Sequence, residues 1–420
     1  MSEFIIEGGH SLSGTVDVYG SKNAALPLMV AGLLSSSPVT LHNIPAISDV
    51  ARLCDIMTAG GATCERNSTT LTINASSFSA EGIPNDLVGM LRGSILLLGP
   101  LLGRFRYAKL PMPGGDIIGA RPIDAHLDAF TQLGATVTQE KGIVTIDGSH
   151  MKAGEVTLKE FSVTATENVL LVAALLPGTT TVHIAAAEPH VVALAELLTH
   201  MGARVSGAGT HTITIEGVET LQGADYTNIP DMLEAGFFIL LAAATGSEMR
   251  ITHVPLTHLR LFFKKIDDIG IAYTIENEEN DIATIVVHPS QMKSFTVQTL
   301  PYPGIPTDLQ ATFSVIATQV TGSSLIHDPM YEGRFKHVIE LEKMGADVTV
   351  CDPHRVIITG PTPLHGHTIP SLDIRSGATL LMAGLVAEGT TTIADAEIID
   401  RGYANLLERL RALGAQISRT

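Results

Sequence analysis

Residues 170–184 read LLVAALLPGTTTVHI, and residues 201–217 read MGARVSGAGTHTITIEG. The first stretch is a helix of small apolar residues that ends at Pro-Gly and continues into a strand. The second begins where another helix ends at a glycine, and it continues into two strands. Apolar residues on all sides of a helix indicate burial, and alternating polarity indicates a strand with one buried face. The sequence therefore predicts a unit of helix, strand, helix, strand and strand.

This unit recurs along the whole chain. The glycines that end its second helix, within GGATC, LGATV, MGARV, IGIAY, MGADV and LGAQI, are Gly61, Gly134, Gly202, Gly270, Gly345 and Gly414. Their successive spacings are 73, 68, 68, 75 and 69 residues in a chain of 420. Self-similarity at a fixed period is typical of repeat architectures. We therefore predict six copies of one α/β unit.

The two ends of the chain predict how the copies are grouped. The sixth copy has six residues after Gly414, too few for its closing strands, whereas residues 4–20 (FIIEGGHSLSGTVDVYG) are similar to residues 212–228 of the third copy. Residues 1–21 are therefore predicted to complete the sixth copy. This places residues 1–21 and 231–420 in one α/β domain with copies four to six, and residues 22–230 in another with copies one to three. A cleft is expected between the domains.

Composition narrows the class of protein. Lys and Arg number 26 and Asp and Glu number 43, which gives a net charge of −17 and argues against nucleic acid or an anionic membrane as partner. No apolar helix reaches the roughly 20 residues of a membrane span. Cys54, Cys64 and Cys351 form no CxxC motif and no signal peptide is recognised, so a cytoplasmic location is expected. His365 and His367 are interpreted as a solvated turn and not as a metal site.

The second copy is longer than the others. From the residue that ends the first helix to the glycine that ends the second, five copies span 23 to 25 residues, whereas the second spans 31, from Gly103 to Gly134. The extra residues fall in LPMPGGDIIGARPIDAH, residues 110–126. A Gly-rich stretch with one acid is often only a turn. As the main insertion in a sixfold repeat, residues 112–124 are predicted to form a mobile active-site loop.

The starts of the first helices carry an excess of positive charge. The residues predicted there are Lys22, Arg92, Thr164, Met232, Asp308 and Arg375. Thr164-x-x-Glu167 and Thr307-x-x-Gln310 are interpreted as capping boxes that support these starts. Helix N-termini bind phosphate and carboxylate, so cations at equivalent starts, with Arg121 in the insertion, predict an anionic substrate. The alternatives are solvated surface charges and, for Asp308, an acid that only stabilises its helix.

Several segments carry a family resemblance. They are GSKNAALPLMVAGLL (20–34), LRGSILLLGP (91–100), GGDIIGARPIDAH (114–126), IPTDLQATFSVIA (305–317), YEGRFKHV (331–338), LDIRSGATLLMAGLVAEGT (372–390) and IDRGYANLLERLRALGA (399–415). Together they resemble the UDP-N-acetylglucosamine 1-carboxyvinyltransferases, which are enolpyruvyl transferases. The resemblance implies an inside-out α/β barrel of two domains, each built from three βαβαββ-type units.

The resemblance also implies an activity. Members of this family transfer enolpyruvyl from phosphoenolpyruvate to the 3′-hydroxyl of UDP-N-acetylglucosamine and release phosphate, in the first committed step of peptidoglycan synthesis. The reaction is an addition followed by an elimination. It needs cations for the phosphate and carboxylate, a base near the sugar hydroxyl and an acid for the methylene carbon. Both implied ligands are small molecules, and neither a cofactor nor a metal is implied.

Site residues follow from the same resemblance. Asp116 is implied as the general acid and Asp308 as the base, while Lys22, Arg121 and Arg401 would bind phosphoenolpyruvate with support from Arg375. Positions that match nucleotide-sugar contacts are Asn23, Arg92, Arg121, Pro122, Ile123, Asp124, Ala125, Ser162, Val163, Asp308 and Met330. Glu188 and Arg334 also match active-site positions.

The chain departs from the family pattern at three positions. Asp116 stands where most members have a reactive Cys, so insensitivity to fosfomycin, which alkylates that thiol, is expected. Glu160 stands where Lys is usual, and Met232 where Arg is common. The last two departures are either neutral drift or signs of a paralogue that acts on a different nucleotide. Two alternative functions remain beside the one that the resemblance implies. One is an enolpyruvyl transferase that acts on shikimate 3-phosphate or a nucleoside, and the other is a paralogue that binds a UDP-sugar without turnover.

Overall fold

The computed structural model describes residues 2–80, 83–114 and 121–420. The described chain forms two compact units. The first unit contains residues 2–19 and 230–420, and the second contains residues 20–114 and 121–229. Asp116 lies outside the described residues.

The three sheets of the first unit share one strand order. The sheet of the fourth copy has the strands β15 (Ala272–Glu279), β16 (Ile282–His288), β14 (Glu248–Pro255) and β2 (Ser13–Asp17). The sheet of the fifth copy has β19 (Asp347–Asp352), β20 (Arg355–Gly360), β18 (Gly322–His327) and β17 (Thr296–Gln298). The sheet of the sixth copy has β23 (Gln416–Arg419), β1 (Glu3–Glu7), β22 (Thr390–Ala394) and β21 (Thr368–Pro370). In each sheet the last strand is a short parallel edge strand, and the other pairs are antiparallel.

The two N-terminal strands join different sheets. β1 pairs with β22 and β23 and so lies in the sheet of the sixth copy, whereas β2 pairs with β14 in the sheet of the fourth copy. The expectation that residues 1–21 complete the sixth copy is therefore confirmed for β1 and wrong for β2. The strand that precedes the fourth copy in sequence, β13 (Asp225–Thr227), pairs instead with β3 (Val39–His42) in the second unit. At each crossing, the strand before it thus stays in a sheet of the unit that the chain is leaving.

The second unit repeats the sheet pattern with one exception. Two of its sheets have four strands each. In order, the strands of the first copy are β4 (Thr63–Asn67), β5 (Thr70–Asn74), β3 and β13, and those of the third copy are β11 (Arg204–Ser206), β12 (Thr212–Gly217), β10 (Gly178–His183) and β9 (Glu155–Thr157). The second copy has β7 (Thr136–Glu140), β8 (Ile143–Asp147) and β6 (Tyr107–Pro111), and within the described ranges it lacks a parallel edge strand. The short helix α3 (Asn85–Gly89) contacts β6 instead.

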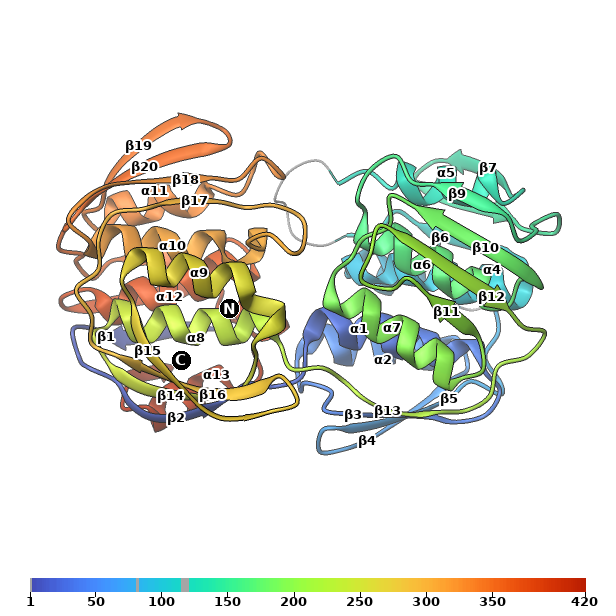
Figure 1. Cartoon of the computed structure of the whole chain (residues 1–420), viewed down its shortest axis with the longest axis horizontal. Coiled ribbons are helices and arrows are strands. Elements are labelled where there is room, and N and C mark those ends of the chain that lie inside the picture. Colours follow the sequence, from blue (N-terminus) through green and yellow to red (C-terminus); the bar gives the residue numbers. More distant parts are fainter. Residues whose placement is uncertain (1, 81–82, 115–120) are drawn as a thin grey trace. The chain divides into compact units, whose positions relative to one another are not determined.

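The first helices of copies four to six form the core of the first unit. α8 (Met232–Ala244), α10 (Thr307–Gln319) and α12 (Ile374–Val386) are buried over nearly their whole length, and α10 contacts both of the others (Figure 1). The second helices, α9 (Arg260–Ile269), α11 (Lys336–Lys343) and α13 (Leu406–Ala412), have mixed buried and exposed faces. Short 3₁₀ turns are η3 (Thr257–Leu259) and η4 (Ala396–Arg401). An apolar helix surrounded by sheets and amphipathic helices is the expected core arrangement.

The second unit has the same two classes of helix. Its first helices are α1 (Lys22–Ala31), which continues into η1 (Gly32–Leu34), α4 (Leu98–Phe105), which follows the 3₁₀ segment η2 (Arg92–Leu97), and α6 (Val163–Ala173). Its second helices are α2 (Ser48–Ala59), α5 (Asp124–Gln132) and α7 (Pro189–His200). α7 contacts both α1 and α6 and is mostly buried. No helix in the described part of the chain has the length and apolar character to cross a membrane.

The repeated glycines have a conformational cause. All six, from Gly61 to Gly414, adopt positive φ angles between +90° and +114°. Residues with a Cβ rarely adopt this left-handed conformation, which lets the chain leave a helix and enter a strand within two residues. Five of the predicted helix starts agree with the structure to within one residue, and Lys22 and Met232 are themselves first residues. Arg92 instead begins the 3₁₀ segment η2, six residues before α4.

The predicted capping boxes are wrong. Ser162 and not Thr164 caps α6, through a hydrogen bond that its Oγ accepts from the Ala165 amide at 3.4 Å. Glu167 is buried inside the second turn of that helix, and Gln310 is likewise buried in α10. Local sequence cannot reveal this, because packing of the whole helix decides which residues point inward.

Candidate active site

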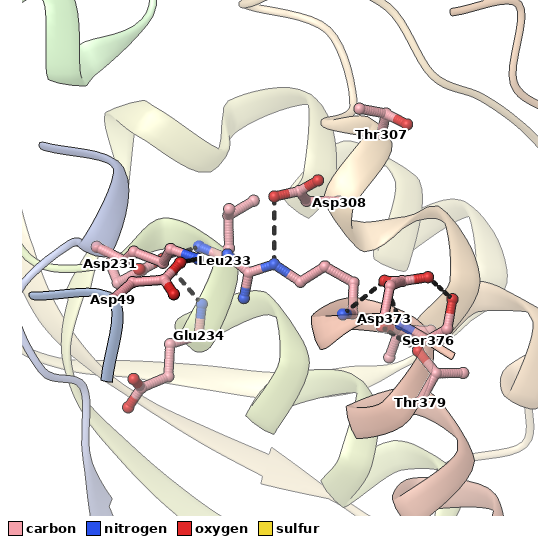
Figure 2. Close-up of polar contacts among 12 residues, drawn as sticks. Asp49, Asp231, Leu233, Glu234, Thr307, Asp308, Asp373, Ser376 and Thr379 are labelled. Atoms are coloured by element: carbon pink, nitrogen blue, oxygen red, sulfur yellow. Dashed lines mark hydrogen bonds and ion pairs between the residues drawn. The ribbon is translucent and has the colours of Figure 1, made fainter. Parts of the chain in front are cut away.

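Two aspartates set the helix starts in the first unit. Asp231 Oδ1 accepts from the backbone N–H groups of Leu233 at 2.8 Å and Glu234 at 3.1 Å. Asp373 Oδ1 accepts from the N–H groups of Arg375 at 2.9 Å and Ser376 at 3.0 Å (Figure 2). A carboxylate in this position satisfies N–H groups that a helix leaves without partners. The caps therefore fix where α8 and α12 begin and where the side chains of their first turns lie.

Asp308, the second residue of α10, lies between two arginines. Arg334 Nη2 donates to Asp308 Oδ1, and Arg375 Nε donates to Oδ2 at 3.2 Å. Both arginines are only 7% exposed, so solvent does little to weaken these ion pairs. Burial alone would raise the pKa of Asp308, but the two guanidiniums outweigh burial and hold that pKa below its usual value. Asp308 is therefore a carboxylate at neutral pH.

Arg334 is held in place by its neighbours. Its Nε donates to Thr307 Oγ1 at 3.1 Å, and its guanidinium carbon lies 5.5 Å from the centre of the Tyr331 ring. Asp328 accepts from the Met330 N–H at 2.9 Å, which fixes the backbone that leads to Arg334. The Met330 side chain is exposed. The segment 328–335 is thus tied to the start of α10.

Arg375 has an unused donor. Its Nη1 is buried and has no hydrogen-bond partner in the described chain. Its guanidinium carbon lies 5.3 Å from the centre of the Tyr403 ring. Burial raises the pKa of Tyr403 to about 12, although the positive charge of Arg375 lowers that pKa. Arg401 is the last residue of η4, two positions before Tyr403, and is partly buried. A buried guanidinium with a spare N–H is suited to an anionic ligand.

In the second unit, Lys22 begins α1 directly after its cap. Ser21 Oγ accepts from the Ala24 N–H at 3.3 Å, and Lys22 Nζ lies 2.7 Å from Asp49 Oδ2. The Lys22 side chain is 11% exposed and the Asp49 side chain 2%, so this is a largely buried ion pair. Asn23 follows in the first turn and is partly exposed. The helix start therefore combines a lysine with backbone N–H groups.

Arg92 holds the backbone that follows the insertion. Its Nη2 donates to the carbonyl of Arg121 at 2.7 Å and to that of Pro122 at 3.4 Å. Ile123 is buried, and Asp124 begins α5. Both carbonyls accept from the same nitrogen, and the ammonium of a lysine, on a shorter side chain, would not reach its position. Arg92 therefore ties η2 to the segment that carries Arg121.

Two further residues near these positions were not singled out as site residues by sequence reasoning. His126 Nε2 lies 2.8 Å from Thr164 Oγ1, and burial, together with the charge of Arg92, lowers the pKa of His126 to about 4. Glu167 is fully buried, and burial followed by the charge of Glu188 raises its pKa well above the usual value. His126 ends the RPIDAH segment, which was its only signal in the sequence.

The remaining predicted positions lie as follows. Ser162 and Val163 form the start of α6, Glu188 precedes α7, and Ala125 is buried in α5. Met232 packs in the core of the first unit, which explains an apolar residue there. Glu160 is exposed, and its neighbour Lys159 lies 3.0 Å from Asp128 in an open groove that Asp124 also lines.

Residues 6–410 match the family of EPSP synthase (3-phosphoshikimate 1-carboxyvinyltransferase). The chain is 41% identical over 419 residues to the UDP-N-acetylglucosamine 1-carboxyvinyltransferase 2 of Listeria innocua, covering 100% of this chain and 98% of the relative. The protein of that name from Bacillus subtilis is also 41% identical, with 100% and 97% covered.

Two solved structures of enolpyruvyl transferases share the fold of this chain. The enolpyruvyl transferase NikO from Streptomyces tendae superposes with a TM-score of 0.89 at 28% identity, covering 100% of this chain and 99% of that one. EPSP synthase from Acinetobacter baumannii superposes with a TM-score of 0.75 at 21% identity, covering both chains fully. The predicted α/β fold class is confirmed.

Proposed function

Because the chain belongs to the UDP-N-acetylglucosamine 1-carboxyvinyltransferases within the EPSP synthase family, we propose that it transfers enolpyruvyl from phosphoenolpyruvate to the 3′-hydroxyl of UDP-N-acetylglucosamine and releases phosphate. This reaction is the first committed step of peptidoglycan synthesis. The observation that carries the proposal is the Asp308 carboxylate between Arg334 and Arg375, with a spare N–H on Arg375. A base beside a cation for an anionic co-substrate is what this transfer requires.

Asp308 is proposed as the base that takes the proton of the sugar hydroxyl. With both arginines on the carboxylate, its low pKa makes it a weak base. If the Arg375 guanidinium turns to the phosphate or carboxylate of phosphoenolpyruvate, Asp308 loses one ion pair and its pKa rises. The hydroxyl oxygen then bonds to C2 of phosphoenolpyruvate as its proton passes to Asp308. The base would thus be activated only when the second substrate is bound.

Positive groups are proposed to hold phosphoenolpyruvate. Lys22 at the start of α1 offers a charge together with backbone N–H groups, which is the chemistry that binds phosphate at helix N-termini. Arg121 and Arg401 are the other proposed cations. Asp116, on sequence grounds alone, is proposed to protonate the methylene carbon in the addition. Elimination then removes a methyl proton and expels phosphate, which restores the double bond.

The nucleotide sugar is proposed to contact the starts of α5 and α6. Arg92 supports this assignment, because it fixes the backbone of Arg121 and Pro122 immediately before α5. Val163 at the start of α6 supplies an N–H group suited to a diphosphate, and Ser162, the cap of that helix, lies directly before it. We place the reaction in the cytoplasm, in line with the acidic composition and the cysteine pattern of the sequence.

The test is a phosphate-release assay with phosphoenolpyruvate and UDP-N-acetylglucosamine. The wild type should release phosphate only when both are present, and Asp308→Asn should be slower by about 10²- to 10⁴-fold, the usual contribution of a positioned base. Asp352→Asn is the matched control, because Asp352 also pairs with an arginine, Arg355, but on exposed β19. No release by the wild type would refute the proposal. Release with shikimate 3-phosphate in place of the UDP-sugar would change the assigned acceptor.

A further inference from the structure

His337, the second residue of α11, is fully buried and uses both ring nitrogens. Its Nδ1 lies 3.0 Å from the carbonyl oxygen of Arg334, and its Nε2 lies 2.9 Å from Ser314 Oγ. A carbonyl can only accept, so Nδ1 carries the proton and donates. Burial lowers the pKa of His337 to about 4, so the ring is neutral and Nε2 accepts from the Ser314 hydroxyl.

These contacts connect both the guanidinium and the backbone carbonyl of Arg334 to one helix, α10. Ser314 lies on α10, six residues after Asp308. The Arg334 guanidinium donates to Thr307 and Asp308 at the start of α10, while its carbonyl is held through His337 to Ser314 further along the same helix. Neither His337 nor Ser314 contacts Asp308 in these hydrogen bonds. The pair acts only through Arg334 and the segment that precedes it.

We propose that His337, anchored by Ser314, is a positioning residue that sets the placement of Arg334 against Asp308 and of the segment 328–335 that carries Met330. The proposal rests on the function proposed above. Tight placement matters because a shift of about 1 Å in a positioning group can cost about 100-fold in rate. The charged groups that face His337 are Asp373 and Arg334 itself, and neither offers its ring a better partner.

Three substitutions test this role by phosphate release. His337→Phe keeps a planar ring but removes both hydrogen bonds, and it should lower kcat by about 10- to 100-fold. Because Met330 matches a nucleotide-sugar position and Arg334 holds Asp308, the proposed base for the sugar hydroxyl, the KM for UDP-N-acetylglucosamine should rise by about 5-fold or more, while that for phosphoenolpyruvate stays within about 2-fold. His337→Asn places an amide N–H where Nδ1 was and should recover most of the loss. Ser314→Ala should show a weaker form of the same pattern.

A merely structural role predicts a different result. Partial unfolding removes active molecules, so it lowers kcat and leaves both KM values unchanged. Thr318→Val is the control for this effect, because Thr318 is buried on the same helix and both partners of its hydroxyl lie on that helix: it donates to the carbonyl of Val315 and accepts from Gln319 Nε2. If His337→Phe does not fold, Ser314→Ala and His337→Asn carry the test.

The outcomes separate this proposal from the one it rests on. If the folded His337 and Ser314 variants keep the kcat of the wild type and its KM for UDP-N-acetylglucosamine, the positioning role alone is refuted. His337→Asn no better than His337→Phe would also refute it. Absence of wild-type phosphate release with UDP-N-acetylglucosamine would refute the proposed function and the positioning role together.

Discussion

Arg375 Nε lies 3.2 Å from Asp308 Oδ2, so a cation in the first turn of α12 neutralises an acid in the first turn of α10. The same guanidinium keeps Nη1 buried without a partner. Burying a donor in this way costs free energy, which a ligand that accepts from Nη1 would recover. The ion pair between Arg375 and Asp308 therefore links the pKa of the proposed base to the binding of an anion by Arg375.

The Asp308 ion pairs should make stability depend on pH. The pKa of Asp308 is depressed in the folded protein, so its contribution is fully present above the unfolded value of about 3.9 and is lost as pH falls below it. Asp308→Asn should therefore lower the free energy of unfolding by about 3 kcal/mol at pH 7, and by less at pH 3. Urea unfolding of both proteins checks this, with Asp352→Asn as control. A difference that grows on acidification would contradict it.

Glu167 should show the opposite dependence. Burial, and then the charge of Glu188, raises the pKa of Glu167, so the folded state favours its protonated form and loses stability as pH rises above about 4.3, the unfolded value. Glu167→Gln mimics the neutral acid and should raise the free energy of unfolding by about 1 kcal/mol or more at pH 8, with little effect at pH 4. Glu219→Gln, at an exposed position, should change neither value. Equal effects of Glu167→Gln at both pH values would count against a buried neutral carboxyl.

Arg92→Lys should weaken nucleotide-sugar binding. The lysine keeps the charge, but its side chain is shorter and its ammonium does not reach the position from which Arg92 Nη2 donates to the carbonyls of Arg121 and Pro122. We expect the KM for UDP-N-acetylglucosamine to rise by about 10-fold, corresponding to the loss of about one charge-assisted hydrogen bond. Arg104→Lys is the matched control, because Arg104 also donates to two carbonyls in the same unit, those of Leu33 and Ala75. Similar KM changes in both variants would show that Arg92 has no specific role.

Asp116 should decide the response to fosfomycin. A carboxylic acid can serve as a general acid but does not react as a thiolate does, so the wild type should keep its activity in the antibiotic. Asp116→Cys should become sensitive, and Asp116→Ala should lose most turnover. Residual activity after incubation and the mass of the protein check the three cases. Rapid stoichiometric alkylation of the wild type at Asp116 would contradict the prediction.

Most of the repeat architecture could be predicted because its signals are local. The glycines that follow each second helix need positive φ, and the apolar first helices and alternating strands carry their periodicities in consecutive residues. The starts of α1 and α8 were predicted to the residue for the same reason. The placement of β2 was missed, because its pattern identifies a strand but does not say which sheet edge it joins.

The sequence by itself determined the repeating unit, the helix starts and the excess of cations at those starts, since spacing and backbone conformation depend on neighbouring residues. Only the tertiary structure decided which charges meet. Asp308, Arg334 and Arg375 come from three separate segments, and their mutual distances set the pKa of the acid. Burial likewise lowers the pKa of His337 and raises that of Glu167, because the pKa of a side chain depends on the solvent and charges that the folded chain places around it.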